Sequence, residues 1–139
     1  MIAQTLFILG SVPLILLGAL HLVFTLRDHK SPRYIVPRSD DLIQQMQAEP
    51  LRLTSETTMW RAWIGFNISH SIAVLLVGVG YLYLSLRYFP TLRADIIIHW
   101  AAPVLAWVFV ILSKCFWFSK PLRGSFVSAV FFTIGAFLA

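Results

Sequence analysis

Four long apolar stretches are the feature that most constrains this chain, because together they cover most of its 139 residues. The first, residues 5–26, holds no charged side chain, and as an α-helix it would span about 33 Å. The hydrocarbon core of a bilayer is about 30 Å thick, so a helix of this length can cross it. The other stretches are residues 59–86, 96–113 and 121–139. We therefore predict an all-α, polytopic membrane protein, a four-transmembrane-helix bundle that forms a single domain over residues 1–139.

The shortage of charged residues excludes an ordinary soluble domain. Only 12% of the residues are charged, whereas soluble domains carry about 25%. The net charge is +5, but the basic residues flank the apolar stretches, so we expect membrane lipids and not nucleic acid as their partners. Cys115 is the only cysteine, which excludes an internal disulfide and any metal site built from several cysteines. No cofactor is predicted, apart from the haem alternative considered below.

The first connection, residues 27–58, is the only long polar stretch, and three prolines interrupt it. At residues 39–41 a serine precedes two aspartates, which is typical of a helix start because acidic groups favour the positive end of the helix dipole. We expect this short amphipathic helix to lie on the membrane surface or to cap the bundle. Residues 54–58 are expected to begin the second span. The apolar face of the short helix is formed by Leu42, Ile43 and Met46.

Basic residues are distributed unevenly among the three connections. The second connection carries only Arg87 and Arg93. The third carries Lys114, Lys120 and Arg123. The first connection and its flanks carry the most, namely Arg27, Lys30, Arg33, Arg38, Arg52 and Arg61. Because alternate connections share a side and Lys and Arg are enriched on the cytoplasmic side, we predict that connections one and three are cytoplasmic and that both termini face outward.

Polar side chains inside the apolar stretches are the candidate functional residues, because each costs free energy in a bilayer unless it is paired. His21 lies about 9 Å inside the boundary at Arg27, measured along the helix. Asn67 and His70 lie about 9 Å and about 14 Å inside the boundary at Arg61. Since the first two helices run antiparallel, we expect these three side chains to meet. His99 lies near the opposite membrane face beside Trp100, where we expect an interfacial side chain.

Helical spacing extends the three residues into a polar pocket. Thr25 and Asp28 follow His21 on one helix face, and Trp63 shares a face with Asn67 and His70. Asp28 and Arg61 would stand at the mouth of the pocket. The predicted ligand-binding residues are therefore His21, Thr25, Asp28, Arg61, Trp63, Asn67 and His70.

Several functions are compatible with this pattern. Asn and His often form hydrogen-bonded contacts between membrane helices, which would be purely structural. A pocket would make the chain a lipid- or hydrophobic-small-molecule-binding bundle. The alternatives are an accessory or structural subunit of a larger membrane complex, a homo-oligomer, or a haem, redox or enzymatic protein that uses His21 and His70. An enzyme is disfavoured because no nucleophile or carboxylate lies at their depth, and a proton-coupled transporter because no carboxylate is embedded in a span.

The segment W-R-A-W-I-G-F-N-I-S-H-S, residues 60–71, resembles the signature segment of a family of small bacterial membrane proteins with four spans. The segment G-A-L-H-L, residues 18–22, is similar to that family too. The resemblance implies a bacterial inner-membrane protein. It implies no activity and no role for any residue.

Overall fold

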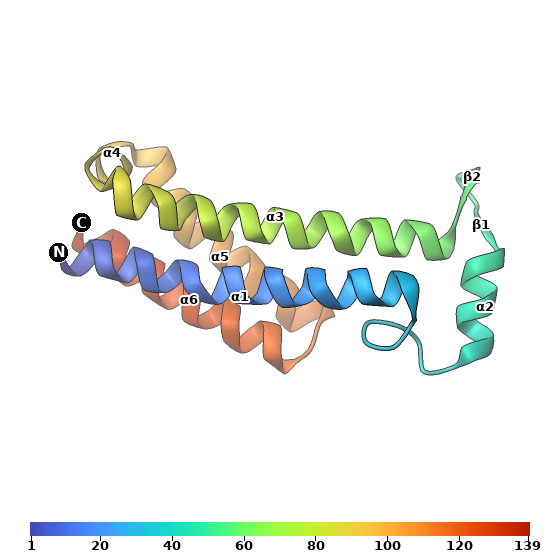
Figure 1. Ribbon diagram of the computed structural model, residues 1–139. Coiled ribbons are helices and arrows are strands. Elements are labelled where there is room, and N and C mark those ends of the chain that lie inside the picture. Colours follow the sequence, from blue (N-terminus) through green and yellow to red (C-terminus); the bar gives the residue numbers. More distant parts are fainter. The chain divides into compact units, whose positions relative to one another are not determined.

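The computed structural model describes residues 1–139, and four long helices make up most of it (Figure 1). Each of the four is long and apolar enough to cross a membrane, as the sequence predicted. Two of them have 29 residues, whereas the other two have 21 and 20. At 1.5 Å per residue the longer pair measures about 43 Å and the shorter pair about 30 Å. The longer pair is α1 (Ile2–Lys30) and α3 (Met59–Arg87), and the shorter pair is α5 (Ile96–Phe116) and α6 (Ser119–Leu138).

Capping and charge explain where two of these helices begin and end. The Asp95 carboxylate accepts hydrogen bonds from the backbone N–H groups of Ile97 and Ile98, which have no partner within the first turn of α5. At the other end of the chain, α1 continues beyond its apolar stretch through Arg27 and Lys30. Positive charge in a last turn is favourable because that end of a helix carries a partial negative charge.

A two-stranded hairpin and a short helix depart from the prediction. Residues 54–58 do not begin the second span but form β2 (Thr54–Thr58), which pairs antiparallel with β1 (Pro50–Leu51). Threonine favours extended backbone because its side chain is branched at Cβ. The backbone N–H of Arg61 then donates to the Thr58 hydroxyl over 3.4 Å, so the last residue of β2 caps α3. The second addition is the short helix α4 (Phe89–Ala94), which has a proline in its first turn.

The chain divides into two compact units. The four-helix unit comprises Met1–Leu17 and Val74–Ala139, and so contains parts of α1 and α3 together with α4, α5 and α6. The loop unit comprises Gly18–Ala73, and so contains the remainder of α1 and α3 together with α2 (Asp40–Ala48) and the hairpin.

Close helix packing characterises the four-helix unit. Phe7 and Phe132 are fully buried, and their ring centroids are 5.6 Å apart. A Cβ atom added at Gly10 would lie 2.8 Å from the Phe132 ring. One added at Gly78 would lie 2.8 Å from the Ile15 side chain and 3.0 Å from its backbone nitrogen. Only glycine permits these approaches, which agrees with the role of small residues between membrane helices.

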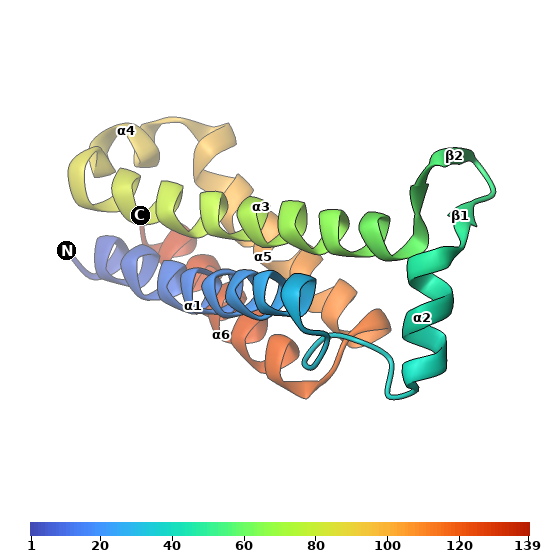
Figure 2. The same ribbon diagram turned by 45° about the vertical axis from the view of Figure 1, so that its right-hand side comes forward.

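In the loop unit, α2 lies near the beginning of α3 (Figure 2), and side chains of the two helices share an apolar cluster. The Ser39 hydroxyl caps α2 by accepting a hydrogen bond from the Leu42 backbone N–H. Ile43 is buried with Trp60 and Ile64 of α3. Leu42, which was expected on the same apolar face, is exposed instead.

Candidate functional site

Within the loop unit, His21 of α1 lies against Asn67 and His70 of α3. His21 Nε2 is 2.9 Å from Asn67 Oδ1. The rings of His21 and His70 meet edge to face, with centroids 5.6 Å apart. Asn67 is buried, whereas both imidazoles are only half-buried. The structure therefore brings together the three side chains that the sequence placed at similar depth, and we call them the His–Asn cluster.

The amide of Asn67 joins this cluster to Trp63, one turn earlier on α3. Asn67 Nδ2 donates to the backbone carbonyl oxygen of Trp63 over 2.8 Å. The indole N–H of Trp63 donates in turn to the carbonyl oxygen of Ile35 over 3.0 Å. Trp63 thus connects the His–Asn cluster with the loop that follows α1.

Asp28 of α1 is hydrogen-bonded to the backbone of the same loop. Its carboxylate is 1% exposed and accepts backbone N–H bonds of 2.6–2.9 Å from Arg33, Tyr34 and Ile35. Hydrogen bonds to an ionised acceptor are stronger than neutral ones, and three of them satisfy a buried carboxylate well. Since the carbonyl group of Ile35 bonds to Trp63, the loop is tied to both α1 and α3.

The remaining predicted residues contribute less directly. Thr25 is buried, and its hydroxyl donates to the His21 carbonyl oxygen over 2.8 Å within α1. The Arg61 side chain is exposed. Of the seven predicted residues, three form the His–Asn cluster, two fix the adjoining loop, one is bonded within its own helix and one is exposed.

Sequence reasoning missed two participants in this region. Ile35 acts through its backbone N–H and carbonyl groups, and no residue type marks such a role. Phe66 is 67% exposed, and its ring lies nearly parallel to that of His70 at a centroid distance of 6.4 Å. The i, i+4 spacing of Phe66 and His70 was the available signal, because side chains so spaced are neighbours on a helix.

The imidazole and amide groups of the His–Asn cluster can donate and accept hydrogen bonds. The chain has no group of three or more His, Cys, Asp or Glu side chains placed to hold a metal ion. A haem with two axial histidines would stand between the imidazoles, whereas the rings of His21 and His70 contact each other directly. His21 Nε2 is also already bonded to Asn67. Haem ligation would therefore require the cluster to come apart.

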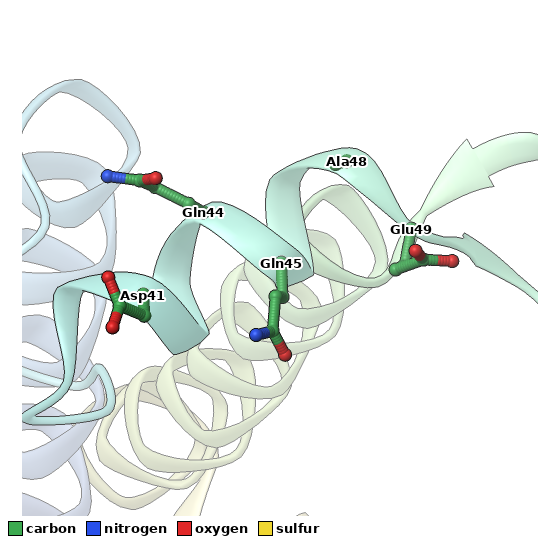
Figure 3. A pocket seen from close by; sticks show the side chains of 5 residues that line it. All are labelled: Asp41, Gln44, Gln45, Ala48 and Glu49. Atoms are coloured by element: carbon green, nitrogen blue, oxygen red, sulfur yellow. The ribbon is translucent and has the colours of Figure 1, made fainter.

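A shallow pocket lies on the polar side of α2 (Figure 3), and none of the predicted ligand-binding residues lines it. It is built from consecutive turns of a single helix, and its polar groups are carboxylates and amides. No basic or aromatic side chain lines it. The lining residues are Asp41, Gln44, Gln45, Ala48 and Glu49.

His99, in the four-helix unit, lies beside Trp100 as expected, but its side chain is buried within the protein. It is 6% exposed, and its Nε2 lies 3.0 Å from the carbonyl oxygen of Ala136. Its ring also contacts those of Phe7 and Trp100, at centroid distances of 5.5 and 5.7 Å. Counting residues from a charged boundary estimates how deep a residue lies along its helix. It does not show which side of the helix faces the neighbouring helices, and the side of α5 that carries His99 faces the protein.

No protein-family model matches the chain, and neither a curated protein nor a solved structure matches it.

Proposed function

We propose that this chain is a four-helix membrane bundle that binds the polar group of a lipid or another hydrophobic small molecule at the His–Asn cluster. The observation that carries the proposal is the half-buried state of the His21 and His70 rings, in helices apolar enough to cross a membrane. A purely structural contact between helices would be favoured by full burial, as is seen for Asn67.

The His21 ring is only half-buried, so the protein leaves part of its edge uncovered. A polar group exposed to hydrocarbon loses the hydrogen bonds that water would provide, which costs free energy. A ligand that supplies a polar group at this depth removes that cost. The exposed ring of Phe66 beside His70 adds an apolar surface against which the rest of such a molecule can pack.

The orientation in the membrane is part of the proposal. The uneven distribution of basic residues supports a chain with both termini outside and with connections one and three in the cytoplasm. The resemblance noted for residues 60–71 supports a bacterial inner membrane. The His–Asn cluster would then open toward the cytoplasmic half of the bilayer.

Cys115 allows a direct test of this orientation, because it is the only cysteine, is exposed and lies near the end of α5. We expect a membrane-impermeant maleimide to leave it unlabelled in intact cells and to label it after permeabilisation. Labelling in intact cells would show that the orientation is the opposite of the one proposed.

Native mass spectrometry of the protein released from its membrane tests ligand binding. We expect an amphipathic molecule to remain bound to the wild-type protein and to be lost from the His21→Ala and Asn67→Leu variants. His29→Ala is the matched control, since His29 is exposed in the last turn of α1. Equal occupancy in all four proteins would refute the site. A stoichiometric protein partner in place of a small molecule would favour the alternative of an accessory subunit.

A further inference from the structure

The side-chain amide of Asn67 has only one chemically acceptable orientation. One of its two polar atoms lies 2.8 Å from the carbonyl oxygen of Trp63, which can only accept a hydrogen bond. That atom must therefore be the amide nitrogen. The reverse orientation would place two acceptors in contact. Asn67 Oδ1 is consequently the atom that faces His21.

This orientation fixes the proton on His21. Oδ1 can only accept, so His21 Nε2, which is 2.9 Å away, must carry the hydrogen and donate it. A neutral imidazole has a single N–H, and its other nitrogen is an acceptor. Neutral His21 therefore has a bare Nδ1, and the one hydrogen bond that its ring makes within the protein is made through Nε2. The ring is half-buried, so it is not sealed from its surroundings.

We propose that the His–Asn cluster selects amphipathic molecules by a hydroxyl group, which donates its hydrogen bond to Nδ1 of His21. This inference rests on the proposed function and names its ligand class. A long-chain alcohol, an acylglycerol with a free hydroxyl or a quinol has the required donor. An ester, an ether, a ketone or an oxidised quinone offers only acceptors, and two acceptors facing each other repel. The Trp63–Asn67–His21 chain of hydrogen bonds thus sets specificity through the tautomer that it imposes.

Matched probes separate the inference from the proposed function. The full chain in detergent micelles is titrated with hexadecan-1-ol and with its methyl ether, 1-methoxyhexadecane, and bound fractions are read by native mass spectrometry. Loss of one hydrogen bond predicts that the ether binds about fivefold more weakly. We expect His21→Ala to abolish the difference between the probes and the His29→Ala control to retain it.

Each outcome has a defined meaning. Equal binding of alcohol and ether, or tighter binding of the ether, would overturn the hydroxyl selectivity while leaving a binding site. Binding of neither probe above the level of His21→Ala would count against the proposed function itself. If His21→Ala does not fold, Asn67→Leu serves in its place, because it removes the group that imposes the tautomer.

A second measurement tests the tautomer without any ligand. In protein labelled with ¹⁵N-histidine, the nitrogen shifts distinguish a protonated ring nitrogen from a bare one. We expect His21, assigned by comparison with the His21→Ala spectrum, to show a protonated Nε2 and a bare Nδ1. A protonated Nδ1 with a bare Nε2 would overturn the inference whatever the binding data show.

Discussion

His21 and His99 use the same ring nitrogen in the same way but in different units of the molecule. In each, Nε2 faces an oxygen that can only accept, Asn67 Oδ1 at 2.9 Å and the Ala136 carbonyl oxygen at 3.0 Å. In the neutral form of either ring, Nδ1 is therefore bare. That atom of His99 is buried without a protein partner, whereas the His21 ring is half-buried. Access to the bare Nδ1, and not its protonation, is therefore what would allow His21, unlike His99, to bind a ligand as proposed.

The partners of the two rings reinforce this difference. Ala136 is in the last turn of α6, where carbonyl groups have no partner within the helix, so His99 satisfies a group that would otherwise be orphaned. Asn67 is a side-chain partner that is already bonded within α3. Loss of His99 should accordingly damage the fold, and loss of His21 should damage binding.

The largest expected effect is the difference in stability between two single variants, His99→Ala and His21→Ala. His99→Ala leaves a cavity beside Phe7 and an unpaired carbonyl group, and we expect it to lower the free energy of unfolding by about 3 kcal/mol. His21→Ala removes a single hydrogen bond between helices and should cost about 0.6 kcal/mol. Denaturation of both variants in mixed micelles measures these values. If His21→Ala were the more destabilising change, the conclusion that His99 is the structural histidine would be wrong.

Asp28→Ala should have an intermediate effect that is confined to the loop unit. The change removes three hydrogen bonds to a carboxylate, and we expect it to cost about 2 kcal/mol. The backbone amides of Arg33, Tyr34 and Ile35 should then exchange with deuterium at least about tenfold faster, which mass spectrometry of peptides can detect. Amides of α5 and α6 serve as the internal control. Faster exchange there as well would show that the two units do not respond independently.

Two glycines, one in each unit, are expected to show the smallest effects on stability. A Cβ atom at Gly78, in the four-helix unit, would collide with Ile15, whereas one at Gly65, in the loop unit, would meet nothing within 4 Å. We expect Gly78→Ala to destabilise the protein by about 1 kcal/mol through overpacking. Gly65→Ala should stabilise it by about 0.5 kcal/mol, because alanine favours the helix. Thermal unfolding of the two variants gives the sign of each effect, and a loss of stability at Gly65 would indicate that something outside the chain packs there.

Hydropathy made the four long helices predictable, because length and lack of charge suffice to identify them. The meeting of His21 with Asn67 was predictable for a related reason, since equal depth on antiparallel helices brings side chains together. The role of Asp28 was not, because its partners are backbone N–H groups that any residue could supply. The burial of His99 was missed because depth does not define which side of a helix faces the protein. The hairpin at residues 50–58 was missed because a threonine-rich segment suits both a helix start and a strand.

The unequal lengths of the helices bear on which membranes the protein can occupy. At about 30 Å, α5 and α6 are no longer than the hydrocarbon core of an average bilayer, and the first turns of α6 carry Lys120 and Arg123. At about 43 Å, α1 and α3 exceed it and can adapt by tilting or by extending into the headgroup layer. Any thickening of the bilayer by sterols or longer acyl chains therefore acts first on α5 and α6. In a membrane, the shorter pair would therefore set the hydrocarbon thickness that all four helices accommodate best.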